Sequence, residues 1–194
     1  MKINNLLNLS LAFLLSLSCF ATQSMDSSLK LTIKELTEKM QQCSLLASDG
    51  SSVARLVITN GDNLAIFGSS LFDTIDISTM PPEVAPLIPI VKSIKTKHDL
   101  KKVTMICDLY VPLAYRGNGY AHQLLKETCT HIFNQGVKTV VLAPGPFEYQ
   151  KDGQTIVLND ENKKQRLIKL YQSCGFTTEG ENAALYMYRH AENS

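Results

Sequence analysis

The segment that most constrains the fold joins an apolar strand to an amphipathic helix through a turn with two glycines. Residues 103–111 are strongly apolar, which predicts a central strand. Gly117 and Gly119 predict the turn, and apolar residues recur at helical spacing over residues 120–134. A buried strand that leads into such a helix is typical of a sheet with helices packed on its faces.

The rest of the chain supplies further elements around this segment. The sequence Asn60-Gly61-Asp62-Asn63 is typical of a hairpin. Residues 73–101 contain four prolines, so a long, partly extended loop is expected there, with a short helix from Val91. Strands are expected at residues 29–36, 53–59, 64–71, 137–143, 176–179 and 184–189, and helices at about 37–47 and 160–174.

Length and composition agree with one globular domain. The chain has 194 residues and a formal net charge of +1, which suits a single hydrophobic core. It has no basic run of the kind that follows a phosphate backbone, so nucleic-acid binding is not expected. The order of elements predicts an α+β (mixed α/β) fold: a central twisted mixed sheet of six to seven strands flanked by helices.

The five cysteines do not predict a metal site. None is at Cys-x-x-Cys spacing and no histidine cluster accompanies them, so neither zinc nor another metal is expected. Cys107, Cys129 and Cys174 each lie in an apolar stretch, where a small buried hydrophobic side chain is the favoured interpretation. The sequence leaves disulfide pairing open.

The N-terminal residues have the pattern of a secretory signal peptide. Lys2 precedes an apolar run over residues 6–20, and Cys19-Phe20-Ala21 provides the small residues of a cleavage site. An uncleaved membrane anchor is the alternative, although a spanning helix needs roughly 20 apolar residues. We therefore expect a signal peptide at 1–21, a linker at 22–28, one domain at 29–190 and a tail at 191–194. The protein is expected to be secreted or exported, with a membrane-anchored or cytoplasmic protein as the alternative.

The glycine turn has the features of an anion-binding site. The first turn of a helix has N–H groups without intrahelical partners, and the helix dipole adds positive potential, so this turn suits a pyrophosphate. Arg116 adds a permanent charge. The segment Asn118-Gly119-Tyr120 lacks the Gly-Lys-Ser/Thr of a P-loop, and His122 replaces the third glycine of a dinucleotide fingerprint. The glycines alone are equally consistent with a turn that only connects a strand to a helix.

Two motifs resemble those of the GNAT acetyltransferase superfamily. The sequence Arg116-Gly117-Asn118-Gly119-Tyr120-Ala121 is similar to the family signature Arg/Gln-x-x-Gly-x-Gly/Ala, and residues 108–111 are similar to the strand before it. The sequence Leu170-Tyr171-Gln172-Ser173-Cys174-Gly175-Phe176 is similar to the family segment Leu-Tyr-x-x-x-Gly-Phe. The motifs occur in the family order with one strand between them. The resemblance extends over about residues 29–189 and is specific from about residue 103.

The resemblance implies a GNAT-like fold and an N-acetyltransferase with acetyl-CoA as its co-substrate. It implies that the backbone amides of Leu109 and Val111 bind the acyl carbonyl and the pantetheine arm. It implies that Tyr171 is the general acid for the departing thiolate; without the resemblance, this tyrosine would be interpreted as a core aromatic residue. An amine attacks the thioester directly, so no covalent enzyme intermediate and no metal is required. The pyrophosphate would be bound by the amides of six consecutive residues: Arg116, Gly117, Asn118, Gly119, Tyr120 and Ala121.

Some features differ from the family pattern or leave its chemistry open. Lys164 stands where many family members have an asparagine that contacts the cofactor, and residues 145–160 form a longer link than is usual. Asp108 and Glu148 are candidate general bases, because the attacking amine must be neutral. A non-catalytic acyl-CoA-binding or interaction module on the same fold is the alternative function.

Several partners are compatible with the sequence. The acceptor amine belongs to a small molecule, a peptide N-terminus or a lysine side chain of a protein, and its pocket is expected from the helix at 37–47 and the stretches 73–101 and 145–160. A membrane would be contacted through the N-terminal segment alone, and no sequence feature predicts an oligomeric state. Because acetyl-CoA is a cytosolic metabolite, export would require that the protein works in another cell's cytosol; otherwise residues 1–21 have a different role.

Overall fold

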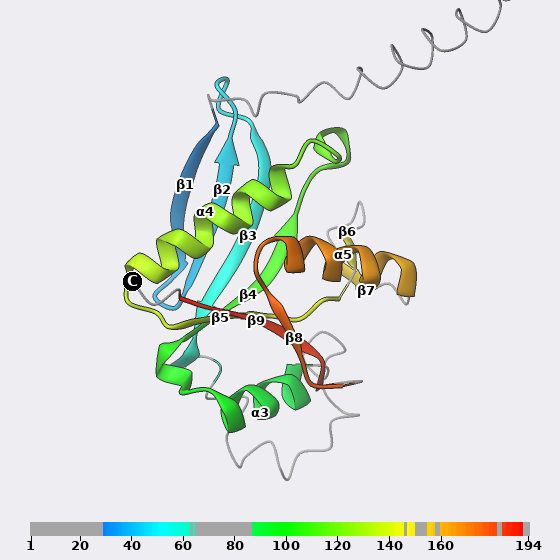
Figure 1. The fold of residues 1–194 in the computed structure, drawn as a ribbon. Coiled ribbons are helices and arrows are strands. Elements are labelled where there is room, and N and C mark those ends of the chain that lie inside the picture. The colour runs from blue at the N-terminus through cyan, green and yellow to red at the C-terminus, as the bar shows by residue number, and fades with distance from the viewer. Residues whose placement is uncertain are drawn as a thin grey trace, which may run out of the picture.

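The computed structural model describes residues 29–62, 64, 87–145, 147–149, 155–157, 160–181 and 184–191. Within these residues a seven-stranded sheet has the order β1-β2-β3-β4-β5-β9-β8, and β6 and β7 form a separate two-stranded sheet (Figure 1). The strands are β1 (Lys30–Thr37), β2 (Met40–Leu46), β3 (Ser52–Asn60), β4 (Val103–Tyr110), β5 (Thr139–Leu142), β6 (Phe147–Tyr149), β7 (Thr155–Val157), β8 (Thr177–Glu179) and β9 (Tyr186–His190). The helices are α3 (Leu87–Lys97), α4 (Tyr120–Asn134) and α5 (Glu161–Ser173), with short 3-10 helices η3 (Leu100–Lys102) and η4 (Leu113–Tyr115).

The large sheet is mixed, as expected. Strands β4 and β5 run parallel, whereas the other neighbouring pairs are antiparallel. The predicted α+β fold, with six to seven strands and flanking helices, is therefore confirmed. The predicted helix over residues 120–134 and the helix that follows Asp160 are confirmed as well.

Residues 40–46 form strand β2, so the helix expected at 37–47 is wrong. Strand β2 pairs antiparallel with β1, and Thr37 lies opposite Met40 at the turn. The Thr37 hydroxyl accepts a hydrogen bond from the Lys39 amide at 3.3 Å within that turn and caps no helix. Cys43 and Leu45 are fully buried on one face of the sheet, which is the two-residue period of a strand. The three-residue spacing of Met40, Cys43 and Leu46 only imitates a helical stripe.

The hairpin expected at residues 60–63 is also wrong. Gly61 and Asp62 are helical, and β3 pairs with β2 and β4. Gly61 lies against the backbone of Leu100, where an added Cβ would come within 1.5 Å of the carbonyl oxygen. This glycine is therefore needed for a close backbone approach and not for a two-residue turn.

Several predictions fall outside the described residues. They are the signal peptide at 1–21, the linker at 22–28, most of the strand expected at 64–71 and the proline-bearing stretch 73–86. These predictions stay predictions. In the part of the chain that the structure describes, no helix combines the length and the apolar character that crossing a bilayer requires.

Helix α3 covers one face of the sheet. It begins at Leu87, ahead of the expected start at Val91. Pro89 lies in its first turn, where a backbone N–H has no intrahelical partner and a proline is tolerated. The buried residues that pack here come from α3, β4, β5 and β9 and include Ile90, Val91, Ile94, Val103, Met105, Val141 and Tyr186.

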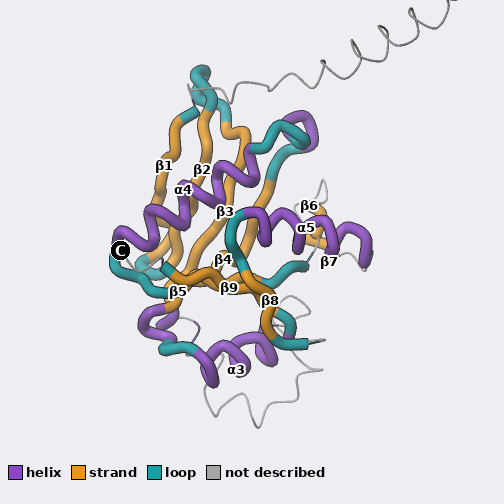
Figure 2. The backbone as a smooth tube through the Cα atoms, in the orientation of Figure 1, coloured by secondary structure: helices purple, strands orange, loops and turns teal. Residues whose placement is uncertain are grey.

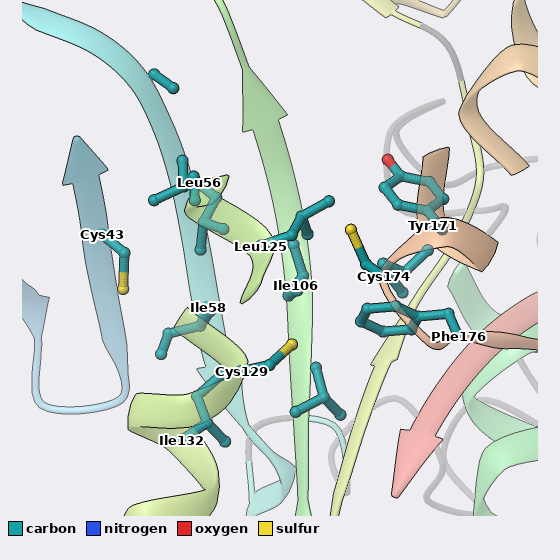
Figure 3. Close-up of a cluster of buried hydrophobic side chains, with 14 of the residues drawn as sticks. Cys43, Leu56, Ile58, Ile106, Leu125, Cys129, Ile132, Tyr171, Cys174 and Phe176 are labelled. Carbon is teal, nitrogen blue, oxygen red and sulfur yellow. The ribbon is translucent and has the colours of Figure 1, made fainter. Parts of the chain in front are cut away.

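Helices α4 and α5 pack on the opposite face. Figure 1 shows α4 lying across β1, β2 and β3. Leu124, Leu125 and Cys129 of α4 are fully buried against the sheet. Tyr171 and Cys174, at the end of α5, belong to the same cluster, which Figure 3 shows between the helices and β4. The core is thus two apolar layers, one on each side of the sheet.

The four cysteines among the described residues are free thiols. Cys43, Cys129 and Cys174 are buried, whereas Cys107 is exposed. The expectation that Cys107 is a buried hydrophobic residue is therefore wrong. Its exposure follows from the register of β4, because Ile106 lies opposite Ile58 and Asp108 lies opposite Val57, which makes Cys107 an extra residue in the strand.

The core cluster predicts a contrast between two leucines. Leu125→Ala removes a fully buried side chain and is expected to lower the free energy of unfolding by about 2–5 kcal/mol. Leu113→Ala removes a side chain that is 78% exposed and is expected to change it by less than about 0.5 kcal/mol. Urea unfolding followed by circular dichroism measures both, and equal losses would contradict the described core.

Candidate active site

The candidate site is built where β4 and β5 part. Their parallel pairing runs from Val103 opposite Thr139 to Ile106 opposite Leu142. Strand β4 continues to Tyr110, still paired with β3 on its other side. Figure 1 shows the two strands diverging beyond this point, with α5 drawn beside the divergence. In the described part of the chain, the β5-facing edge of β4 past Ile106 is therefore not covered by a neighbouring strand.

The bulge at Cys107 decides which way the residues at the end of β4 point. Leu109 and Val111 pack with the cluster on the α4 side. By alternation, Asp108 and Tyr110 face the other side of the sheet, opposite Val57 and Arg55. The sequence left the orientation of Asp108 open because the bulge is visible only in the pairing with β3. The structure thus places the predicted residues Asp108, Leu109 and Val111 together at one strand end.

A short loop connects this strand end to α4. It contains η4 and then Arg116, Gly117, Asn118 and Gly119, and Figure 2 shows it between the strand and the helix. The Arg116 Nε donates a hydrogen bond to the Val111 carbonyl at 2.9 Å, and the Asn118 Nδ2 donates to the Tyr115 carbonyl at 3.2 Å. The loop is therefore held by its own side chains, and Arg116 has a structural contact in addition to its charge.

Both glycines of the loop adopt left-handed backbone conformations. The φ angle is 84° at Gly117 and 77° at Gly119, a region that side chains other than glycine disfavour. An added Cβ at either position would meet no atom within 4 Å. The glycines are therefore required by the path of the backbone, and the space beside them is open.

The start of α4 has no side-chain cap. Gly119 is its N-cap residue and makes no side-chain hydrogen bond, and no acidic residue lies in its first turn. Helix α5 differs, because the Asp160 carboxylate accepts a hydrogen bond from the Lys163 amide at 3.0 Å. The first-turn amides of α4 and the positive end of its dipole are thus suited to an anion.

Tyr171 combines a buried ring with a hydroxyl near Asp108. The side chain is 6% exposed, and its ring centroid lies 6.2 Å from that of Phe176. In Figure 3 its hydroxyl points away from Phe176. Burial raises the pKa of the Tyr171 phenol, and the carboxylate of Asp108 and the thiol of Cys174 raise it further. Tyr171 is therefore protonated at neutral pH, and its ring belongs to the core while its hydroxyl lies near a carboxylate.

Two further predicted positions lie on other elements. Glu148 lies on β6, opposite Ile156 of β7, and its side chain is outside the described part of the structure. Lys164 lies on α5, and its amide donates to the Asp160 carbonyl at 3.0 Å. Among the described residues, no group of three or more histidine, cysteine, aspartate or glutamate side chains is arranged to hold a metal ion.

One group near the site was missed by the sequence reasoning. A pocket at the ends of β3 and β4 is lined by Ser52, Arg55, Tyr110 and Pro112. The Arg55 guanidinium carbon lies 5.2 Å from the centroid of the Tyr110 ring. The only signal in the sequence is one arginine within the apolar run of residues 53–58.

Comparison with known proteins agrees with this arrangement. Residues 91–176 match the model of the Acetyltransferase (GNAT) family. The GNAT resemblance is confirmed. The matched segment covers somewhat less than half of the chain and contains both motifs, the turn between β4 and α4 and the end of α5. No curated protein matches the sequence.

Solved structures are similar to this GNAT-like chain at low sequence identity. An acetyltransferase of Bacillus subtilis in complex with CoA is 13% identical, with a TM-score of 0.47, over 84% of this chain and 99% of that chain. A GCN5-related N-acetyltransferase from Kribbella flavida is 12% identical, with a TM-score of 0.46, over 81% and 71%. A mutant of spermidine N-acetyltransferase from Vibrio cholerae is 11% identical, with a TM-score of 0.44, over 80% and 66%.

The backbone of the loop predicts different costs for two glycine substitutions. Gly119→Ala forces a Cβ into the left-handed region and is expected to lower the free energy of unfolding by about 1–2 kcal/mol. Gly145→Ala is the matched control, because Gly145 also has nothing within 4 Å of an added Cβ but has no left-handed φ angle. Urea unfolding compares them, and an equal loss in both variants would contradict the described loop.

The proximity of Asp108 and Tyr171 predicts a change in titration. Asp108→Asn removes a negative charge that raises the pKa of Tyr171, so the phenol is expected to ionise at a lower pH. The ultraviolet absorbance of phenolate, taken as the difference from Tyr171→Phe, measures this pKa. Glu127→Gln on α4 is the control and is expected to leave it unchanged. An unaltered titration in Asp108→Asn would show that the two side chains are not neighbours.

Proposed function

We propose that the protein is an N-acyltransferase that moves an acetyl group from acetyl-CoA to an amine acceptor. The observation that carries this proposal is the uncapped start of α4, with its two left-handed glycines, directly after the strand end where β4 leaves β5. The anion site at the start of α4 and the uncovered edge of β4 are therefore neighbours along the chain. Coenzyme A has a pyrophosphate followed by an amide-bearing arm, so its pyrophosphate can bind at the anion site and its arm along the strand edge.

The residues fit this co-substrate in the following way. The backbone amides of Arg116, Gly117, Asn118, Gly119, Tyr120 and Ala121 bind the pyrophosphate at the positive end of the α4 dipole. The backbone amides of Leu109 and Val111 bind the pantetheine arm and the acyl carbonyl. The open space beside Gly117 and Gly119 supports this assignment, because a ligand can approach the backbone there.

The reaction is a direct transfer. The nitrogen of a neutral amine attacks the thioester carbonyl, a C–N bond forms, and the C–S bond breaks to release the CoA thiolate. The amine loses one proton to a general base, for which Asp108 and Glu148 are the candidates. The thiolate gains one proton, which Tyr171 donates. Nothing in this balance requires a metal or a covalent enzyme intermediate.

The surroundings of Tyr171 keep the phenol protonated. Burial and the Asp108 carboxylate raise the pKa of this phenol, so the proton is in place throughout the neutral range. The same raised pKa makes the phenol a weaker acid, and a phenolate formed by the transfer regains a proton readily.

A non-catalytic acyl-CoA-binding module is the second candidate. It is favoured by the burial of Tyr171, whose ring packs against Phe176 as a core residue does. Lys164, at the position where many GNAT members have a cofactor-binding asparagine, is a further departure from the enzymatic pattern. On this alternative, acetyl-CoA binds and no amine is acetylated.

Thiol release separates the two candidates. With acetyl-CoA and a panel of amines, the wild type is expected to release CoA thiol, and Tyr171→Phe is expected to reduce kcat by roughly 100- to 10,000-fold. Binding of acetyl-CoA, measured by calorimetry, is expected to persist in this variant because the ring is retained. Tyr188→Phe, which lies on β9 in a different aromatic cluster, is the control with unchanged kcat.

The outcomes have distinct meanings. Binding of acetyl-CoA without turnover for every amine would favour the non-catalytic module. Full activity in Tyr171→Phe would assign the proton donor to another group and leave the acyltransferase intact. Export through residues 1–21 remains a separate prediction, on which neither outcome depends.

A further inference from the structure

The pocket at the ends of β3 and β4 lies on the face of the sheet opposite α4. Ser52 and Arg55 come from β3, Tyr110 ends β4, and Pro112 begins the loop that leads to α4. Leu109 and Val111, on either side of Tyr110, pack toward the α4 face. The pocket therefore lies at the same strand end as the backbone amides that are assigned to the acyl-CoA path.

Arg55 has a defined position in this pocket. It lies between Ser44 of β2 and Tyr110 of β4 in the sheet register. Its guanidinium carbon is 5.2 Å from the Tyr110 ring centroid, which is cation–π geometry, and its Nε atom is buried. A planar guanidinium that is oriented by an aromatic ring presents its donors in a fixed direction, which suits a carboxylate.

The same face carries further polar groups instead of an apolar layer. Ser44 is 6% exposed, and its hydroxyl accepts a hydrogen bond from the Gln42 amide nitrogen at 3.1 Å. Asp108 lies on this face two residues before Tyr110. The two faces of β3 therefore differ, because its other face packs in the apolar cluster on the α4 side.

We infer that this pocket binds the carboxylate of the acceptor, so that the acceptor is a small amino acid and not a protein lysine. The inference rests on the proposed acyltransferase function. Residues two apart on one strand face are separated by about 7 Å. That spacing allows one small molecule to place its carboxylate at Arg55, opposite Tyr110, and its amine toward Asp108. A lysine within a polypeptide has no carboxylate beside its amine and lacks this second contact.

Matched pairs of amines test the inference. Leucine is compared with leucinamide, and phenylalanine with phenylalaninamide, because each pair keeps the amine and the size and differs in the carboxylate. The amide members have the less basic amines, so the chemistry alone would favour them at neutral pH. Both kcat/KM for thiol release and binding by calorimetry in the presence of CoA are measured.

The wild type is expected to prefer the carboxylate members by roughly 10- to 100-fold, the range of a charge-assisted hydrogen bond. Arg55→Gln is expected to remove this preference, and Arg55→Lys to retain part of it, since the charge remains and the planar fork is lost. Arg166→Gln, an exposed arginine on α5, is the control with an unchanged preference.

The results separate this inference from the proposed function. Turnover of the amides as readily as the acids by the wild type would overturn the inference and leave the acyltransferase standing. If no amine is turned over while acetyl-CoA binds, the proposed function fails and the calorimetric preference alone decides the inference. Absence of binding by every amino acid would overturn it. If Arg55→Gln no longer unfolds cooperatively, the inference is still tested by the preference of the wild type for the carboxylate members and by the reduced preference of Arg55→Lys.

Discussion

The proposed site depends on the point where the hydrogen-bonded pairing of β4 with β5 ends. The two strands separate after Ile106 and Leu142. Up to that point β4 is a central strand with an apolar cluster on each face. Beyond it, one edge of β4 continues without a strand beside it in the described part of the chain. A strand edge presents N–H and C=O groups at regular intervals, so a ligand with amide groups can take the place of the missing neighbour.

A single extra residue divides the proposed site into two halves. If β4 ran through Cys107 without a bulge, regular alternation would place Asp108 on the same face as Ile106. With the bulge, Leu109 and Val111 lie on the α4 side, while Asp108 and Tyr110 lie on the side where Arg55 lies. The proposed reaction therefore uses the edge of β4 for the co-substrate and the Arg55 side for the acceptor, and a direct transfer requires that the two meet at this strand end.

The sequence predicted the parts of the fold that depend on local interactions. Helix α4 has a strong apolar period, and Asp160 caps α5 through a hydrogen bond to a residue three positions away. Strand β2 was missed because its character comes from its partners β1 and β3, which its own residues do not reveal. The contact of Arg55 with Tyr110 joins residues far apart in sequence. No local pattern signals such a pair, and the direction of Asp108 depended on a bulge that only β3 defines.

The missing cap on α4 has a consequence for the whole protein. Helix α5 completes its first turn with its own carboxylate, whereas α4 begins at Gly119 without one. An anion bound at that turn would complete the helix and bind only the folded chain. Ligand concentration and the folded fraction are then linked by mass action. Under such linkage the concentration of the ligand becomes one of the factors that keep the protein folded.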